Sequence, residues 1–523
     1  MTAAGRTRLS ACGPPAAPAG LRPPALLTGG FQLSTVTLPQ VPIERYTLGN
    51  GLRVVLSEDH SVPVVSVAVY YDVGSRNERE GRTGFAHLFE HMMFQGSENV
   101  PKAGHFQYVF NNGGTMNGTT SSERTNYFET LPSSQLPLAL WLESDRMRSL
   151  KVTQENLDNQ REAVKEEKRL SYDNRPYSNA FLRLNELVFS NPRNAHSTIG
   201  SMEDLDAATV EDVQRFFRVY YAPNNAVLSI AGDFDSAEAR ALVEKYFATI
   251  PSQAPPPPVD VSEPPEVARR AETYRDPFAQ LPAIILGWKV PRRRTPDFYA
   301  LSLGSDLLLD GDSSRLYQRL VKDEESVVGI QGGLGERRGP STLYVFAIPK
   351  PGHPTEEIRA TIDEEIGRLA KEGPTAGEME KLRNTLLNDA VRSRQSTLFR
   401  AQRLAEYTLY DGDPTLFNTE LERYLAVTPE AIREAVDKYL LTDNHSVMEV
   451  VPAHAPEAEQ ALAAEPEPPG EPAEPGSPPP QVTAPPPADP APPTEPAQPM
   501  AEPSTAQQQQ QGQASPANTE RKQ

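Results

Sequence analysis

The sequence predicts an α+β protein made of two similar domains, each of about 200 residues. Three observations support this fold class. Strand and helix patterns are mixed along the first half, a segment of the second half repeats the register of one in the first, and a proline-rich bridge separates the halves. We therefore expect domains at residues 43–250 and 274–452, joined by a linker at 251–273.

The first expected domain opens with two strands, over residues 45–56 and 62–73, which are rich in Val, Leu and Tyr. The first of these contains Asn50-Gly51, a strong signal for a type I′ hairpin. The elements that follow are helices over residues 84–95, 136–150, 154–172 and 209–220, and a strand over 226–232.

The second expected domain opens with a strand over residues 283–290 and a helix over 296–309. Later it repeats part of the first, at an offset of 219 residues: Thr209, Glu211, Val213, Tyr220 and Asn225 correspond to Thr428, Glu430, Ile432, Tyr439 and Asn444. Both segments begin with a Thr helix cap and lead a helix into a strand. Any capped amphipathic helix resembles another, but a shared register over this length favours duplication.

Neither end of the chain shows a helix or strand period. Residues 1–42 are expected to be a disordered or processed leader, and residues 453–523, rich in Pro, Ala, Glu and Gln, a disordered tail. Leu9-Ser10-Ala11-Cys12 has the small-residue pattern of a lipoprotein cleavage site, but a short polar segment precedes it. The sequence as written predicts a soluble cytoplasmic protein, and an upstream start would instead indicate the periplasm or cell envelope.

Composition excludes several classes of protein. The chain of 523 residues has a single Cys, so it cannot be a scaffold held by internal disulfides. Its net charge of −19 argues against nucleic acid as a partner, because phosphate binding needs a basic face. No apolar run approaches the ~18 residues of a transmembrane segment.

The segment around His87-Leu88-Phe89-Glu90-His91 carries the chemistry. On a helix, His87 and His91 lie at i and i+4 on one face, where two imidazoles can bind one zinc ion. Glu90 shares that face and can reach a water on the metal as a general base. This is the inverted zincin spacing, H-x-x-E-H.

A third ligand is expected from the helix over residues 154–172. Its apolar stripe runs through Leu157, Gln160, Ala163, Val164, Glu167 and Leu170, so Glu167 is the carboxylate expected in the core. Gln160, on the same stripe, could fix a metal ligand by a hydrogen bond. The alternative is that the histidines are ordinary partly buried residues and that Glu167 is solvated, but the complete set favours a metal.

With these motifs, residues 43–452 resemble the pitrilysin/insulinase family of inverzincin zinc metallopeptidases, most of all its short bacterial members and the β subunit of the mitochondrial processing peptidase. The resemblance rests on the HxxEH motif, on residues 159–167 (NQREAVKEE), and on Asn117-Gly118-Thr119-Thr120 followed by Thr125-Asn126-Tyr127. It implies two homologous α+β domains, each a sheet backed by helices, that enclose a central cavity with one zinc ion in the first domain.

The resemblance also implies roles for individual residues. His87, His91 and Glu167 would be the zinc ligands and Glu90 the base. Substrate would pair with an exposed strand edge at residues 116–120, where Asn117 and Gly118 would contact the peptide backbone. For Asn117, a turn residue after the preceding glycine pair is an equally good interpretation.

One departure from the family pattern bears on partners. Family members place an Arg and, seven residues later, a Tyr in the second domain, and the alignment puts Val321 and Val328 there. Neither side chain can donate a hydrogen bond. The sequence therefore predicts the zinc subunit of a heterodimer whose homologous zinc-free partner supplies the Arg/Tyr pair, unless Arg315, Tyr317 or Arg319 takes the role.

Together these observations predict a zinc metalloendopeptidase that hydrolyses short or unstructured peptides. The competing hypothesis is a non-catalytic scaffold or binding subunit of the same fold. Elsewhere, Arg292-Arg293-Arg294 is expected in a solvated loop, and the aromatic residues Phe216, Phe217, Tyr220 and Tyr221 are expected in the core.

Overall fold

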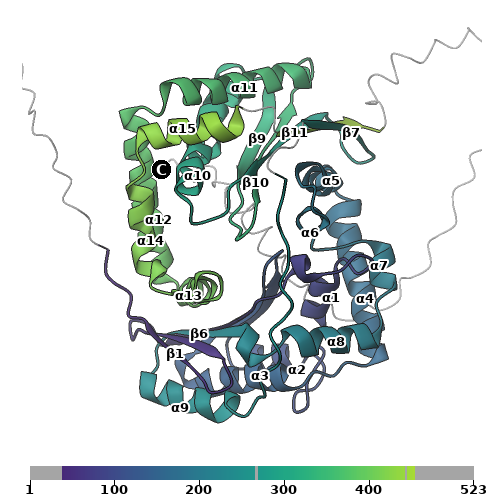
Figure 1. Ribbon diagram of the computed structural model, residues 1–523, viewed down its shortest axis with the longest axis vertical. Coiled ribbons are helices and arrows are strands. Elements are labelled where there is room, and N and C mark those ends of the chain that lie inside the picture. Colours follow the sequence, from purple (N-terminus) through teal and green to yellow (C-terminus); the bar gives the residue numbers. More distant parts are fainter. Residues whose placement is uncertain (1–37, 265–268, 442–444, 454–523) are drawn as a thin grey trace, which may run out of the picture. The chain divides into compact units, whose positions relative to one another are not determined.

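The computed structural model describes residues 38–264, 269–441 and 445–453. It contains two β-sheets, each covered by helices (Figure 1), which confirms the predicted fold class. Nearly all of the expected leader, with Leu9-Ser10-Ala11-Cys12, and nearly all of the expected tail lie outside the described residues. Among the helices that the structure describes, none has the length and apolar character needed to cross a membrane.

The first sheet has six strands in the order β1-β2-β6-β3-β5-β4. Strands β2 and β6 are parallel, and the other neighbours are antiparallel. β4 lies at one edge. The strands are β1 (Glu44–Thr47), β2 (Arg53–Glu58), β3 (Val64–Tyr71), β4 (Thr115–Thr120), β5 (Thr125–Pro132) and β6 (Ala226–Gly232).

The second sheet has five strands in the order β7-β11-β8-β10-β9, with β7 and β11 parallel. Its strands are β7 (Arg270–Asp276), β8 (Ala283–Val290), β9 (Val327–Leu334), β10 (Ser341–Pro349) and β11 (His445–Pro452). The order and direction of these strands repeat those of β2-β6-β3-β5-β4. Duplication, inferred from the sequence offset, is therefore supported by topology.

Fifteen α-helices are present in the described ranges. Those in the first half are α1 (Phe85–Met92), α2 (Gly104–Asn111), α3 (Leu136–Arg148), α4 (Gln154–Lys168), α5 (Ser178–Val188), α6 (Pro192–Ala195), α7 (Met202–Asp206), α8 (Val210–Tyr220) and α9 (Ser236–Phe247). Those in the second half are α10 (Pro296–Leu309), α11 (Thr355–Glu372), α12 (Ala376–Gln395), α13 (Thr397–Asp411), α14 (Leu416–Leu425) and α15 (Pro429–Leu440).

The repeated segments occupy equivalent places. Thr209 and Thr428 cap α8 and α15, and their side chains accept hydrogen bonds from the backbone N–H groups of Asp212 and Ala431. These helices lead to β6 and β11, which take the same position in the two sheets. The last matching residue, Asn444, lies outside the described residues.

Each sheet is covered on one face by a helix from the other half of the chain (Figure 1). α13 packs on β2, β3 and β6, where Leu404 and Ala405 meet Val55 and Ala68 in one buried cluster. In return, α5 packs on β7, β8 and β11, where Leu184 joins a second buried cluster. Because side chains alternate along a strand, Val54 and Leu56 face the core on the opposite side.

The first hairpin forms where it was expected, but its turn is of another type. Leu48 and Leu52 close the loop through a hydrogen bond of 2.9 Å, and Gly51 has φ of 89°. Asn50 does not have the positive φ that a type I′ turn requires. The loop is instead a three-residue connection with glycine at the left-handed position.

Two segments are ordered beyond the expected domain limits. Val41, inside the expected leader, is buried, and its N–H and C=O groups bond the side chain of Asn418. β7 begins at Arg270, inside the expected linker, because its strand pairing with β11 starts there. The end of the linker that was predicted from its proline-rich composition therefore differs from the residue at which the strand pairing of β7 begins.

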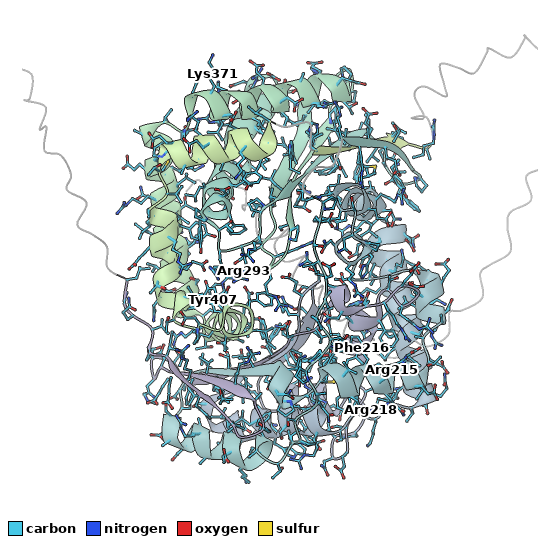
Figure 2. The ribbon with its side chains drawn as sticks, viewed as in Figure 1. Arg215, Phe216, Arg218, Arg293, Lys371 and Tyr407 are labelled. Carbon is cyan, nitrogen blue, oxygen red and sulfur yellow. The ribbon has the colours of Figure 1, made fainter. Side chains whose placement is uncertain are left out.

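The expectation of a solvated loop at Arg292-Arg293-Arg294 is wrong for two of its residues. Arg293 is buried and pairs with Glu406 and Asp411 of α13, beside Tyr407 on the same helix (Figure 2). Arg294 also contacts Asp411. These pairs attach α13 to the second half while its apolar face covers the first sheet.

The buried carboxylate of Glu123, in the turn after β4, contacts both the segment after β3 and the loop between β9 and β10. The carboxylate of Glu123 pairs with the guanidinium of Arg76, and both side chains are more than 90% buried. It also accepts hydrogen bonds from the backbone N–H groups of Arg338 (2.8 Å) and Gly339 (3.2 Å). A half-exposed pair, Arg338 with Asp72, lies beside it.

We expect Glu123→Gln to lower the free energy of unfolding by about 3–5 kcal/mol, because it leaves Arg76 as a buried charge without a counterion. Urea denaturation would measure the change. Asp72→Asn is the control, since it removes the half-exposed partner of Arg338, and should change stability by no more than about 1 kcal/mol. Equal small effects of the two variants would contradict the role given to Glu123.

Candidate active site

Helix α1 carries the HxxEH motif and begins at a buried carboxylate. The two oxygens of Glu78 accept hydrogen bonds from the backbone N–H groups of Gly84 (3.0 Å) and Ala86 (2.7 Å). Negative charge is favourable at a helix N-terminus, where these N–H groups lack a partner within the helix. Gly84 has φ of 79°, and a Cβ there would lie 2.5 Å from the carbonyl oxygen of Ile199. The start of α1 is therefore fixed.

The apolar residues of α1 lie in the core of the first half. Leu88, Phe89 and Met92 are completely buried, and the ring of Phe89 packs against aromatic residues of α8 and its C-terminal end. The predicted core role of those aromatic residues is confirmed: Phe216, Tyr220 and Tyr221 are buried, and Phe217 packs against them. The helix ends at Met92 rather than at residue 95.

Helix α4 packs against α1 and brings Glu167 to the motif. Leu157 and Val164 are completely buried on its inner face, and Glu167 follows one turn after Val164. The predicted stripe is wrong at two positions, since Ala163 is exposed and Leu170 is 64% exposed. The α-helix ends at Lys168, and a π-helical turn over Arg169–Asp173 changes the direction of later side chains.

His87, His91 and Glu167 form a compact group of possible metal ligands. One atom from each residue lies within 4.8 Å of the others. The Oε2 atom of Glu167 is 3.3 Å from Nε2 of His91 and 3.7 Å from Nε2 of His87. Ligand atoms about 2.0–2.1 Å from a tetrahedral zinc lie roughly 3.4 Å apart, so this donor set fits zinc. No second such group occurs in the part of the chain that the structure describes.

Glu90 lies beside this group and is held by the neighbouring strand. It is 8% exposed, and the hydroxyl of Thr120 in β4 donates a hydrogen bond to its Oε2. Gly118 also approaches it, since a Cβ there would lie 3.2 Å from Oε1. The carboxylate of Glu90 is therefore placed between the possible ligands and the edge of the first sheet. Thr120 was not assigned a role from the sequence, although its motif was recognised.

Asn117 and Gly118 lie in β4, the edge strand of the first sheet. Asn117 pairs with Phe128 in the ladder, so the alternative that it is a turn residue is wrong. Its side-chain oxygen accepts a hydrogen bond of 2.9 Å from the N–H of Gly118. The strand edge expected for peptide binding is thus present next to Glu90.

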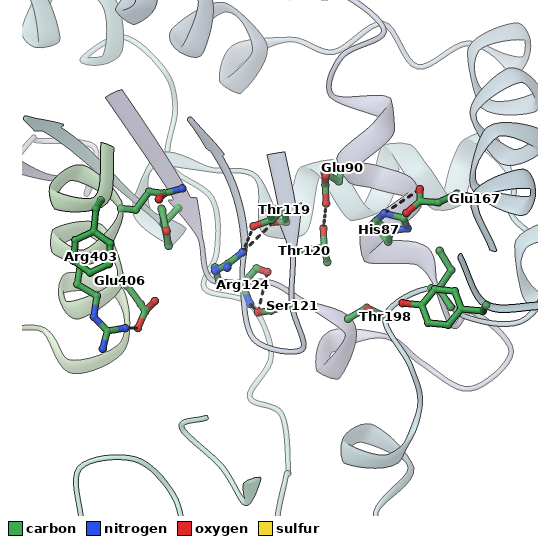
Figure 3. Close-up of a pocket in the computed structure, with 15 residues that line it drawn as sticks. His87, Glu90, Thr119, Thr120, Ser121, Arg124, Glu167, Thr198, Arg403 and Glu406 are labelled. Atoms are coloured by element: carbon green, nitrogen blue, oxygen red, sulfur yellow. Dashed lines mark hydrogen bonds and ion pairs between the residues drawn. The ribbon is translucent and has the colours of Figure 1, made fainter. Parts of the chain in front are cut away.

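The site opens into a cavity of about 450 Å³ that both halves of the chain line (Figure 3). The first half contributes His87, Glu90 and Glu167, together with Arg124 and Tyr172. Helix α13 contributes Phe399, Gln402, Arg403 and Glu406. Sequence reasoning missed the contribution of α13, because no local pattern shows which distant sheet a helix will cover.

Comparison with known proteins agrees with this geometry. Residues 53–201 match the family described as insulinase, peptidase family M16, and residues 207–386 match the peptidase M16 inactive domain. The chain is 30% identical to the zinc protease PqqE of Helicobacter pylori over 369 residues. These aligned residues make up 70% of this chain and 83% of PqqE. The chain belongs to peptidase family M16.

Two further matches extend the comparison. The crystal structure of a protease from Helicobacter pylori matches with a TM-score of 0.76 and 26% identity, over 79% of this chain and 100% of that one. Subunit 1 of the human mitochondrial cytochrome b-c1 complex is 27% identical over 295 residues, which are 56% of this chain and 60% of the subunit. The relatives of this chain thus include named zinc proteases and a named subunit of a larger complex.

The two positions that the sequence alignment assigns to an Arg and a Tyr do not line the cavity. Val328 is 56% exposed on β9, and Val321 packs against the core of the second half. The cations considered as substitutes are engaged elsewhere, since Arg315 pairs with Glu378 and Arg319 with several glutamates. None of these residues lines the cavity.

The two histidines of the M16 motif differ in pKa. Burial and the neighbouring His91 lower the pKa of His87. Burial also disfavours the His91 cation. This effect is outweighed by hydrogen bonds from His91 to Glu167 and Gln160 and by the negative charges of Glu90 and Glu167, so the pKa of His91 is raised. For Glu167, burial raises the pKa, but the two histidines outweigh it and the pKa is lowered.

Zinc affinity should therefore fall with decreasing pH, because a protonated imidazole cannot bind the metal. Below the raised pKa of His91 we expect a loss of about tenfold per pH unit, which steepens only where His87 also takes up a proton. Competition with a chromophoric chelator between about pH 5 and 8 would measure it. An affinity that stays constant over this range would exclude His91 as a ligand.

Proposed function

We propose that this chain is a zinc-dependent endopeptidase that cleaves short or unstructured peptides. The observation that carries the proposal is the convergence of His87, His91 and Glu167 within 4.8 Å, beside the carboxylate of Glu90 and an open strand edge. A cluster of three ligands leaves a tetrahedral ion one position for water or substrate, which is the arrangement of catalytic rather than structural zinc.

In this proposal His87, His91 and Glu167 hold the zinc, one ion per chain. Zinc, when bound, supplies a Lewis acid that polarises the scissile carbonyl and lowers the pKa of water. Glu90 takes the proton from the attacking water and passes it to the leaving amine. Thr120 holds Glu90 in place for both transfers, and Gln160 orients His91.

The substrate lies along β4. An extended peptide can add to this edge through main-chain hydrogen bonds, with Asn117 and Gly118 next to the scissile bond. Backbone already paired within a folded protein cannot make these bonds. Folded proteins should therefore be poor substrates, whereas unstructured peptides of many sequences can bind.

We further propose that a homologous zinc-free subunit completes the site. The alignment to the family pattern puts Val321 and Val328 at the positions of its Arg and Tyr, and neither side chain can donate a hydrogen bond. A partner that carries the pair would supply the missing donors to the substrate and to negative charge on its carbonyl oxygen. Full activity of the purified zinc-loaded chain alone would overturn this part of the proposal.

A non-catalytic scaffold is the second candidate. The match of residues 207–386 to a domain described as inactive, and the relative named as a subunit of the cytochrome b-c1 complex, favour it. Against it stands the complete set of ligand and base residues in the first half. Metal content and turnover distinguish the two candidates.

The test is to measure zinc content and the cleavage of a quenched unstructured peptide, before and after metal removal. We expect one zinc per chain, loss of cleavage after dialysis against a chelator, and recovery with added zinc. The measurement is repeated with the homologous zinc-free subunit added. Absence of zinc, or cleavage that survives its removal, would favour the scaffold or another source of activity.

A further inference from the structure

A second cavity, of about 340 Å³, adjoins the cavity of the proposed active site. The two share Ser121, Tyr172 and Thr198 in their linings. Ser121 follows directly after β4, which ends at Thr120. An extended peptide that lies along β4 therefore reaches the junction between the cavities, and its next residues can enter the second one.

The carboxylates that face this second cavity already have partners. Glu123 pairs with Arg76, as described above. Glu336 pairs with Arg293 at 3.3 Å and with Arg403 at 3.1 Å. These acidic groups are therefore neutralised by arginines, and each is held in place.

The one histidine in the lining, His196, is also paired. Its Nε2 atom is 2.9 Å from Oε2 of Glu78, the carboxylate that caps α1. Hydroxyl and amide groups make up most of the remaining lining, which includes Ser122, Ser197 and Asn185. Such groups can donate hydrogen bonds to an anion.

Arg337 differs from every other charged group in this lining. Within the described residues, no carboxylate oxygen lies within 4.0 Å of its guanidinium, the limit for an ion pair. Its buried Nη1 atom also has no hydrogen-bond partner. Its guanidinium lies 5.5 Å from the ring centre of Phe189. Burial and the nearby Arg76 lower the pKa of Arg337 to about 10, despite the opposing charge of Glu123, so it stays cationic at neutral pH.

Hydrogen bonds hold the backbone on both sides of Arg337, and its guanidinium lies near the ring of Phe189, so part of the ordering that a ligand would require is already present. The carbonyl oxygen of Arg337 accepts a hydrogen bond of 2.9 Å from the N–H of Arg293, and the next residue, Arg338, bonds Glu123. A buried cation without a counterion is unfavourable, and an added carboxylate relieves this through two parallel hydrogen bonds.

We infer that the second cavity is a subsite for a carboxylate of the peptide substrate, with Arg337 as its partner. This inference rests on the proposed function and adds a preference to it. The preferred substrates carry Asp or Glu, or end in a free C-terminus, a short distance along the chain from the scissile bond. Both sources present the same planar anion, which matches the fork of a guanidinium.

Binding to the zinc-loaded Glu90→Gln variant of the full chain tests the inference without turnover. Fluorescent peptides that differ only by Glu or Gln at one position, and by a free or amidated C-terminus, are compared by anisotropy. At one position, or at the C-terminus, we expect the acid to bind roughly tenfold or more tightly than its neutral analogue. The position that shows this preference identifies the source of the carboxylate.

Adding Arg337→Gln should abolish that preference and leave the affinity for the neutral peptide unchanged. Arg337→Lys should keep part of it, because the charge remains but the fork is lost. Arg392→Gln, which removes an exposed arginine of α12, is the control and should leave the preference intact.

Three results would separate the possible failures. If the acid and neutral peptides bind equally at every position, the subsite inference is wrong while the proposed function stands. If Arg337→Gln weakens both peptides to the same extent, Arg337 acts only by packing on Phe189. If the zinc-loaded protein binds none of the peptides, either alone or with the homologous zinc-free subunit added, the proposed function itself fails.

Discussion

Replacing Glu90 by Gln should leave the zinc site filled and lower the rate of peptide cleavage by about 10²–10⁴-fold, the usual contribution of a general base. Gln has almost the same shape and can still accept the hydrogen bond from Thr120. It cannot accept a proton from water at neutral pH. The substitution therefore separates proton transfer from metal binding, since Glu90 is not one of the three clustered ligand residues.

Zinc content by atomic absorption and cleavage of a quenched peptide would be measured on the same preparation. Glu98→Gln, at an exposed carboxylate in the loop after α1, is the matched control and should leave both quantities unchanged. A variant that keeps its zinc and cleaves as fast as the unmodified chain would show that Glu90 is not the base. A variant that loses zinc would show that Glu90 contributes to the metal site.

The elements around the possible metal site were predictable because their signals are local. The i, i+4 spacing of His87 and His91 fixes their relation on any α-helix. Glu167 was identified from helical periodicity, and the structure brings it to the histidines. The same periodicity failed at Leu170, because the change from α-helix to π-helix after Lys168 has no counterpart in the sequence pattern.

The rest of the site depends on contacts between distant segments. α13 lines the cavity because it covers the first sheet, and this placement follows from the packing of Leu404 and Ala405 on strands that include β2 and β3, more than 300 residues earlier. A helix shows in its sequence that it has an apolar face but not which sheet will cover it. The prediction of a solvated loop at Arg293 failed for the same reason, because its partners Glu406 and Asp411 lie on α13, far along the chain.

Replacing Glu167 by Gln should weaken zinc binding by more than about 100-fold, because loss of a direct ligand exceeds the 10–100-fold typical of residues that only orient one. The amide has no charge to offset that of the metal, and it is a weaker ligand than a carboxylate. Cleavage should disappear at limiting zinc, and a large excess of zinc should restore it in part.

Glu166→Gln is the control for this substitution. Glu166 precedes Glu167 in α4, is exposed and pairs with Arg169, so it shares the helix but faces away from the histidines. Zinc affinity would be measured by chelator competition for both variants. A large loss for Glu167→Gln with none for Glu166→Gln assigns the third ligand to one carboxylate. Similar small losses for both would mean that the metal, if bound, takes its third ligand elsewhere, and the geometry that supports an open catalytic zinc would no longer hold.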